Sequence, residues 1–191
     1  LMNVGFAAYY LFFALMMENN GFSGIVVGGL LALATGFEMW AFLRISWFFD
    51  RFSPRSLIAL SLAVTVVRWT ILAFFPGSLL MVGISQLGNA FSFGVFHASC
   101  MRIVSEQFPG RHVGVGMGLL NSLGFGLGGA FGALLMGVLW GAAGAKTMFM
   151  TASLITAAAL FWTLSRPDRN THSPAMSDGA TEQDMHGLPV A

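Results

Sequence analysis

Three ionisable side chains lie inside long apolar runs of the sequence: Glu38, Arg68 and His97. On insertion scales a charged group at membrane depth costs about 2.5–3.5 kcal/mol, so such groups usually mark a pathway or a paired structural site. If all three face one aqueous cavity, they can exchange protons as their access to water changes. We therefore predict that they couple proton movement to substrate movement. The alternatives are a static Glu38–Arg68 ion pair and a histidine that only bonds a backbone carbonyl.

Two amide side chains, Gln86 and Asn89, lie one turn apart in the same run as His97. Asn89 precedes His97 by eight residues, which places both roughly on one face of a helix. These amides can hydrogen-bond a substrate, or merely a neighbouring helix, and we include them in the predicted substrate and proton-coupling site. Three further polar residues in apolar surroundings have the same two possible roles: Asn3, Tyr10 and Asn121.

The segment 124–129, GFGLGG, matches the dinucleotide-binding fingerprint literally. That fingerprint requires a strand before the glycines and a helix after them, whereas this match lies deep inside one apolar run. We therefore reject nucleotide binding. Glycines repeated along this run instead predict a helix that packs closely against a neighbour or slides along it.

Neither a metal-ligand cluster nor a nucleophile–base pair stands out. The four histidines are scattered, and the single cysteine, Cys100, excludes an intrachain disulfide and a multi-cysteine metal cluster. The net charge is +1 and the basic residues form no block, so no feature favours nucleic acid. We expect no enzyme activity, no cofactor, no metal and no nucleic-acid partner.

The composition indicates the elements that must position these side chains. Of 191 residues, 56% are hydrophobic and 9% are charged, and the mean hydropathy is +0.75. Soluble domains carry about 25% charged residues, so lipid is the expected solvent. A spanning helix needs about 20 mostly apolar residues, and the runs are too long and lack the alternation of strands. We predict an all-α polytopic membrane protein with six transmembrane helices, at 1–17, 24–49, 56–75, 79–105, 113–140 and 147–164.

The predicted domains are a six-helix bundle over residues 1–164 and a tail over 165–191. The tail holds three of the six prolines and four acids, and we expect it to be disordered. Cytoplasmic loops carry an excess of Lys and Arg, so the loops with most basic residues and the tail should be cytoplasmic. In the six-span arrangement five basic residues lie on this side: Arg51, Arg55, Arg111, Arg166 and Arg169. Only Lys146 lies in the loops on the opposite side.

Three stretches resemble one family: 89–98 (NAFSFGVFHA), 108–111 (FPGR) and 122–130 (SLGFGLGGA), together with the turn 50–52 (DRF). On these stretches the chain resembles the C-terminal half of a major facilitator superfamily transporter. The most similar branch is phenylpropionate-permease-like, related to the galactoside and nucleoside proton symporters. The resemblance covers about residues 1–165. It implies half of a twelve-helix bundle whose N-terminal six-helix half is missing from this chain, which begins with Leu1.

The resemblance also implies roles for individual residues. Glu38 is similar in position to a sugar-binding glutamate of the galactoside permease. Arg68 and His97 are similar to an arginine and a histidine of its proton-coupling site. The second carboxylate that the family has after the histidine is absent here, where the sequence reads ASCM at 98–101. The proton route therefore departs from the family pattern.

These expectations together describe a proton-coupled symporter of a small organic solute, with an aromatic acid such as phenylpropionate as a candidate substrate. Its partners would be the substrate, protons, the lipid bilayer and the N-terminal half, and its location the bacterial inner membrane with a cytoplasmic C-terminus. The rival hypotheses are a non-transport membrane scaffold or intramembrane enzyme, and a complete small transporter that dimerises.

Overall fold

The computed structural model describes residues 1–166, and all regular structure in that part of the chain is helical. The all-α prediction is therefore confirmed for these residues, while the predicted disorder at 167–191 lies outside them. The elements in chain order are α1 (Met2–Asn19), α2 (Gly24–Leu43), α3 (Ile45–Arg51), α4 (Pro54–Phe74), α5 (Leu79–Leu87), η1 (Ala90–Val95), α6 (Phe96–Gln107), η2 (Gly110–His112), α7 (Val113–Leu119), η3 (Leu120–Leu127) and α8 (Gly128–Ser165).

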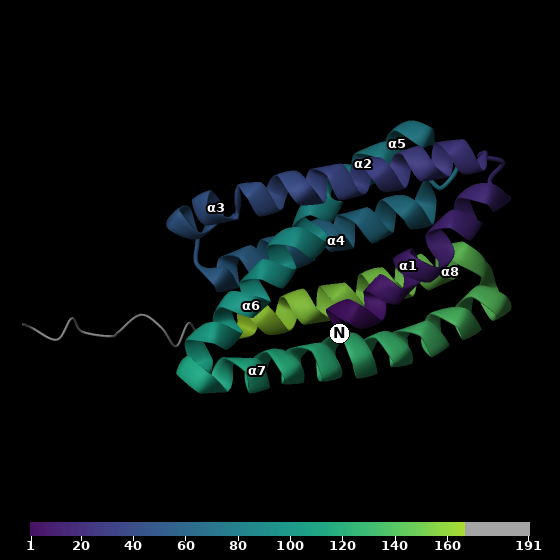
Figure 1. Ribbon diagram of the computed structural model, residues 1–191. Helices are drawn as coiled ribbons and strands as arrows, with labels where there is room; N and C mark the ends of the chain where they lie inside the picture. Colours follow the sequence, from purple (N-terminus) through teal and green to yellow (C-terminus); the bar gives the residue numbers. More distant parts are fainter. Residues whose placement is uncertain (167–191) are drawn as a thin grey trace, which may run out of the picture.

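The long helices run side by side along one direction, with α1 and α4 packed extensively on α8 (Figure 1). Their buried faces form the main core, in which Trp69, Phe13 and Phe149 are almost completely enclosed. A smaller cluster around Phe48 and Leu57 joins the ends of α3, α4 and η1. The same long helices therefore enclose the part of α4 that contains Arg68 and Trp69.

The first turn of α4 shows why the helix begins two residues before its predicted start. Ser53 precedes the helix in an extended conformation, and its hydroxyl accepts a hydrogen bond from the Ser56 amide at 3.1 Å. Pro54 occupies the first turn, where its missing N–H costs nothing and its fixed φ suits the helix. A serine cap followed by proline therefore starts the helix at residue 54.

Three predicted runs are interrupted. The run 24–49 breaks at Arg44, whose φ of −101° and ψ of 7° separate α2 from α3. The runs 79–105 and 113–140 each contain a π-helical segment, η1 and η3. The last predicted loop, 141–146, lies within α8, where Gly144 leaves helical geometry with a φ of +76°. Figure 1 shows the chain turning back on itself within α8.

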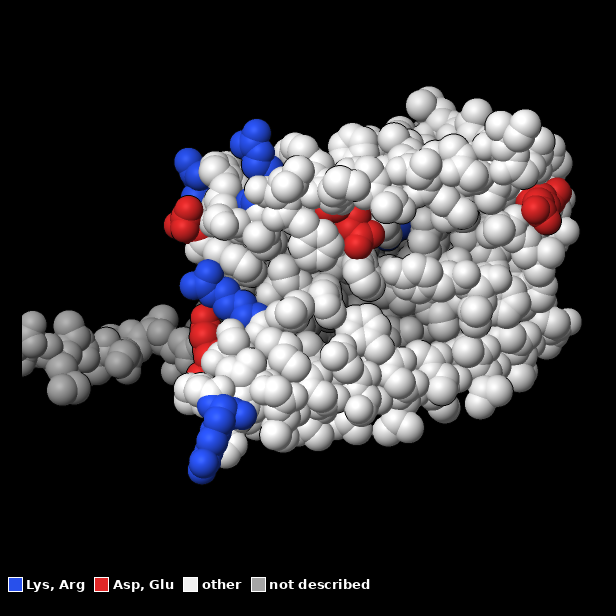
Figure 2. Space-filling view, viewed as in Figure 1, with Lys and Arg blue, Asp and Glu red and all other residues white. Residues whose placement is uncertain are grey.

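Within residues 1–166, four helical stretches are long and apolar enough to cross a membrane: Gly24–Leu43, Pro54–Phe74, Leu79–Gln107 and Gly110–Ser165. The last is 56 residues long and includes the turn at Gly144, while α1 is not among the four. The count of six spans therefore stays a prediction. Many large apolar side chains are exposed on these helices, as lipid-facing surfaces require. Lys and Arg gather at the end that contains α3 and the α6–α7 junction (Figure 2).

Candidate functional site

Arg68 lies in the C-terminal half of α4, six residues before its end, with only 1% of its surface exposed. Its Nε donates to the Ser85 carbonyl at 2.7 Å, while Nη1 and Nη2 have no hydrogen-bond partner among the described residues. The guanidinium carbon lies 5.1 Å from the Tyr9 ring centroid and 5.0 Å from that of Trp69, and cation–π attraction stabilises this position. The site thus contains a desolvated cation with two donor groups that residues 1–166 do not satisfy.

Room for this arginine comes from Gly88, next to the end of α5. A Cβ placed on Gly88 would lie 2.7 Å from Cδ and 3.0 Å from Cγ of Arg68, closer than side-chain carbons normally approach. The backbone at the end of α5 therefore lies directly against the arginine stem, and a glycine is needed at that point.

A buried hydrogen bond joins α1 to α5 beside the arginine. The Tyr9 hydroxyl donates to Gln86 Oε1 at 2.7 Å, and Gln86 Nε2 donates to the Ser85 hydroxyl at 3.4 Å. Sequence reasoning named Tyr10, which is 58% exposed, and missed Tyr9, which is buried. One feature of the sequence could have indicated Tyr9: a tyrosine buried in an apolar run needs a hydrogen-bond partner, and the amide of Gln86 in another run can supply one.

Glu38 lies on α2, half-buried, and its Oε2 accepts a hydrogen bond from Asn89 Nδ2 at 3.1 Å. Asn89 is 5% exposed, and its Oδ1 has no partner among the described residues. Glu38 and Arg68 form no ion pair within 4.0 Å in this part of the chain, so each charge has separate neighbours. Figure 2 shows acidic and basic atoms together midway along a face that is otherwise uncharged.

His97 lies near the start of α6 among aromatic rings. Its ring stacks on Phe93, with centroids 5.6 Å apart and planes 7° apart, and meets the edge of Phe125 at 5.3 Å. No hydrogen bond joins it to Asn89 within residues 1–166. The π-helical segment η1 lies between the two residues and changes the helical register that the predicted shared face assumed.

The aromatic rings continue from His97 toward the arginine. Phe93 lies 6.1 Å from Phe6 and 6.3 Å from Tyr10 by ring centroids, and Phe6 meets the edge of Trp69 at 5.6 Å. Trp69 in turn borders the guanidinium of Arg68. An aromatic surface therefore connects His97 with the cationic part of the site.

The structure thus brings four of the five predicted site residues to one place, around α5. Gln86 and Asn89 lie one turn apart. Their neighbours in the chain, Ser85 and Gly88, contact Arg68. Asn89 itself donates a hydrogen bond to Glu38. Within residues 1–166, no three His, Cys, Asp or Glu side chains are grouped as metal ligands. The glycines of 124–129 lie in η3 and the start of α8, with helix on both sides.

The model of the MFS_1 like family matches residues 1–151, which is most of the chain and all five predicted site residues. The chain belongs to the MFS_1 like family. Neither the curated proteins nor the solved structures include a significant match. Membership of the MFS_1 like family indicates a transport role, and together with the apolar helices it indicates an integral membrane protein. The phenylpropionate-permease-like subtype stays a prediction.

Proposed function

We propose that this chain is the C-terminal half of a proton-coupled symporter that moves a small organic acid by alternating access. The supporting observation is the buried Arg68, whose Nη groups have no acceptor among the described residues. Leaving a buried cation without a partner is costly, so an anion that pairs with it is strongly favoured. A guanidinium binds a carboxylate through two parallel hydrogen bonds. In this proposal Arg68 receives the carboxylate of the substrate.

Glu38 is the proposed proton carrier. Its carboxylate is half-buried five residues before the end of α2, so it can exchange a proton with water when the site is open. Protonation of Glu38 would remove the negative charge to which Asn89 donates a hydrogen bond. Asn89 is next in the chain to Gly88, which contacts the aliphatic part of Arg68. The charge state of Glu38 can therefore act on the position of Arg68 through one short segment of backbone. His97 is a proposed second proton site at the far end of the aromatic surface.

The aromatic surface supports an aromatic acid as the substrate. Aromatic rings pair favourably in stacked and edge-to-face arrangements, and Phe6, Tyr10 and Phe93 present such a surface close to the arginine's neighbours. Because Tyr10 is 58% exposed, part of this surface is open to an incoming ring. A ligand with a carboxylate at one end and a ring at the other would satisfy both parts of the site.

The proposed architecture has six spans, paired with a second six-helix bundle. The turn at Gly144 divides the 56-residue stretch into two passes, and α1 packs along α8 as a further pass. Transporters of this type bind substrate between two bundles near the middle of the membrane. The proposed location is the bacterial inner membrane, with the arginine-rich end in the cytoplasm.

The test uses the full-length protein in proteoliposomes. Glu38→Gln should abolish uphill uptake driven by a proton gradient, while exchange of labelled for unlabelled substrate across the membrane continues, because only the proton step is removed. Glu106→Gln is the matched control, since Glu106 is an exposed acid that pairs with Arg102 at 3.1 Å far from the site. The substrates compared are an aromatic acid, an aliphatic acid and a sugar.

Full proton-driven accumulation by the Glu38→Gln protein would remove Glu38 from the mechanism. Equal uptake of the sugar and the aromatic acid would contradict the assignment of a carboxylate to Arg68. Accumulation by this chain without a second bundle would favour the dimerising small transporter instead, and cross-linking in the membrane would then detect the dimer.

A further inference from the structure

The candidate site contains unsatisfied polar atoms of two opposite kinds. Arg68 Nη1 and Nη2 can only donate hydrogen bonds, whereas Asn89 Oδ1 can only accept them. None of these three atoms has a hydrogen-bond partner within residues 1–166, and the two residues are only 1% and 5% exposed. A buried polar atom without a partner is costly, so both kinds of atom favour a ligand that supplies the missing partners.

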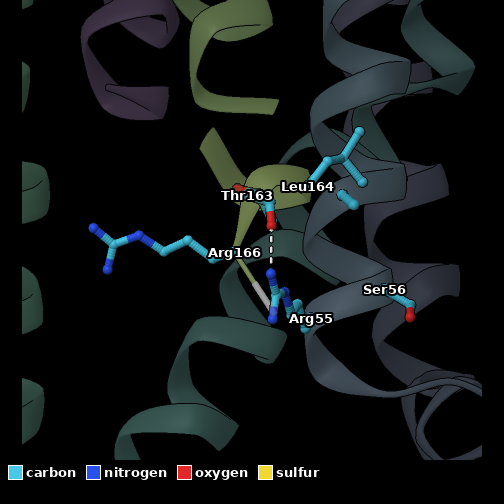
Figure 3. Close-up of a pocket in the computed structure, with 6 residues that line it drawn as sticks. Arg55, Ser56, Thr163, Leu164 and Arg166 are labelled. Carbon is cyan, nitrogen blue, oxygen red and sulfur yellow. Dashed lines mark hydrogen bonds between the residues drawn. The ribbon is translucent and has the colours of Figure 1, made fainter. Parts of the chain in front are cut away.

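Another arginine of α4 provides a contrast. Arg55, in the first turn, donates through Nη2 to the Thr163 carbonyl at 2.7 Å and so ties the start of α4 to the end of α8. This bond borders a pocket of about 370 Å³ near the other end of α4 from Arg68 (Figure 3). The pocket is lined by Arg55, Ser56, Ala59, Thr163, Leu164 and Arg166. Within residues 1–166, neither Nη group of Arg68 has a comparable acceptor.

The segment after α5 places Asn89 next to the arginine. Arg68 Nε donates to the Ser85 carbonyl at 2.7 Å, and residues four apart, such as Ser85 and Asn89, lie on one face of a helix. Gly88 and Asn89 keep right-handed helical backbone geometry beyond the end of α5, so this spacing holds. Gly88 itself packs on the aliphatic part of Arg68. Asn89 therefore lies on the face of the helix that the arginine contacts.

Glu38 fixes the orientation of the Asn89 amide. While Glu38 is ionised, its carboxylate can only accept hydrogen bonds, so the NH2 group of Asn89 must face Glu38 Oε2, at 3.1 Å. The carbonyl oxygen of the amide is then directed away from Glu38, and it keeps its capacity to accept a hydrogen bond. A carboxylate of the ligand cannot satisfy this oxygen, because both groups are acceptors. The ligand must therefore also contain a hydrogen-bond donor.

We propose that the substrate is an aromatic 2-hydroxy acid, which has a hydroxyl on the carbon next to its carboxylate. This inference rests on the proposed function, because it takes the carboxylate to be the group that Arg68 binds. The carboxylate accepts from both Nη groups, and the neighbouring hydroxyl donates to Asn89 Oδ1. The ring of the acid lies on the aromatic surface that includes Phe6 and Phe93. One ligand then satisfies all three atoms.

Two related acids match these atoms less well. An acid without the hydroxyl leaves Asn89 Oδ1 unpaired, and a site that hydrogen-bonds a hydroxyl discriminates strongly against an analogue that lacks it. A 2-amino acid would bring an ammonium group next to the guanidinium of Arg68, and the juxtaposition of like charges is unfavourable. The hydroxyl is neutral and donates one hydrogen bond, which is what Asn89 Oδ1 lacks.

The test is isothermal titration calorimetry of the full-length protein in detergent with four acids. These are 3-phenylpropionate, its 2-hydroxy derivative, its 2-amino derivative and the isomer with the hydroxyl on the ring. The 2-hydroxy derivative should bind about tenfold or more tightly than each of the others, because it alone pairs Asn89 Oδ1 without adding a like charge. Equal affinity of the 2-hydroxy derivative and 3-phenylpropionate, or tightest binding of either other acid, would overturn the proposal. These titrations use the wild type, so they do not depend on the folding of a variant.

Asn89→Ala tests the residue itself and should abolish the preference for the 2-hydroxy derivative over 3-phenylpropionate. The readout is the ratio of the two affinities, because a loss of structure would weaken both acids alike. The matched control is Asn121→Ala, which removes an exposed amide from η3 and should keep the wild-type ratio. An unchanged ratio in Asn89→Ala, or an equal loss in the control, would overturn the assignment of the hydroxyl to Asn89.

Arg68→Gln separates this proposal from the proposed function. Equal binding of 3-phenylpropionate and its 2-hydroxy derivative by the wild type, with both lost in Arg68→Gln, would overturn the 2-hydroxy acid and leave the carboxylate site in place. Binding of none of the four acids by the wild type would overturn the proposed function and this proposal together.

Discussion

Single residues around Arg68 show how a charge is held in an apolar bundle. The aromatic faces of Tyr9 and Trp69 and one carbonyl, that of Ser85, replace part of the lost water. This replacement is incomplete, because neither Nη group is satisfied within residues 1–166. A desolvated charge that is only partly compensated is costly for stability, so its presence favours a role in binding over a role in holding the fold together.

Gly88→Ala tests the fit between Arg68 and the end of α5. The added Cβ would lie 2.7 Å from the arginine Cδ, so the side chain or the backbone must shift. We expect a loss of about 1–3 kcal/mol in the free energy of unfolding, as is typical of overpacking, and impaired transport. Thermal unfolding in detergent measures the first effect and uptake the second. Gly83→Ala in α5, where a Cβ would meet nothing within 4 Å, should change neither, and equal effects of the two substitutions would contradict this account.

The two tyrosines provide a matched pair. Tyr9→Phe removes the donor to Gln86 and leaves a buried amide oxygen without that partner, which should cost about 1–3 kcal/mol of unfolding free energy. Tyr10→Phe removes a hydroxyl from a side chain that is 58% exposed and should change stability by less than about 0.5 kcal/mol. Denaturation of both variants in the same detergent compares the two. If Tyr10→Phe proved the more damaging, the assignment of the buried hydrogen bond would be wrong.

At the scale of elements, two features place the site: the π-helical segments and the close contact of α1 with α8. The segment η1 begins directly after Asn89 and ends just before α6, which contains His97. The chain is therefore α-helical at Ser85, which contacts Arg68, and π-helical between that contact and His97. π-Helical turns are rare and occur often at functional sites. The second feature depends on Gly132, because a Cβ there would lie 2.7 Å from the carbonyl oxygen of Val4. That contact holds α1, and with it Tyr9, against the rest of the bundle.

Gly132→Ala should separate α1 from α8, since the added carbon meets backbone that cannot rotate away. The expected loss is about 1–3 kcal/mol of unfolding free energy, with faster proteolysis within α1. Gly129→Ala, on the same helix with nothing within 4 Å of its Cβ, is the control and should behave like the wild type. Limited proteolysis followed by mass spectrometry locates the opened segment. A stable Gly132→Ala protein with an intact α1 would show that the close contact is not required.

At the scale of the whole molecule, charge and apolar surface are arranged as a membrane requires. Lys and Arg gather at one end of the bundle (Figure 2), while Lys146 follows Gly144 and lies 4.8 Å over the ring of Phe74 at the end of α4. The faces between the ends expose large apolar side chains. We therefore propose that the bundle axis runs across the bilayer with the arginine-rich end in the cytoplasm.

Cysteine labelling tests this orientation. In a Cys100→Ala background, Phe52→Cys and Gly77→Cys place one thiol at each end of α4, both at exposed positions. A membrane-impermeant maleimide should label residue 77 in intact cells, and residue 52 only after the membrane is permeabilised. The reverse pattern would invert the proposed orientation. Labelling of both positions from the same side would contradict α4 as a spanning helix.

Several features followed from the sequence because they depend on local composition. Apolar runs too long for strands predicted helices, and serine, proline and glycine predicted the breaks between most of them. Charges inside those runs were conspicuous because lipid penalises them, which is why Glu38 and Arg68 were candidates before any geometry was known. The break at Arg44 and the π-helical segments were missed, because no residue type marks them in advance.

The sequence by itself determined that this chain is helical and apolar and that a few ionisable groups lie inside its runs, since these are properties of composition and spacing. Only the tertiary structure decided the neighbours of each group. It paired Glu38 with Asn89 and not with Arg68, brought Tyr9 to Gln86, and placed His97 among aromatic rings. The physical reason is that helical register and the crossing points of helices depend on close packing between distant segments. Residues such as Gly88 and Gly132 control that packing only once the helices are assembled.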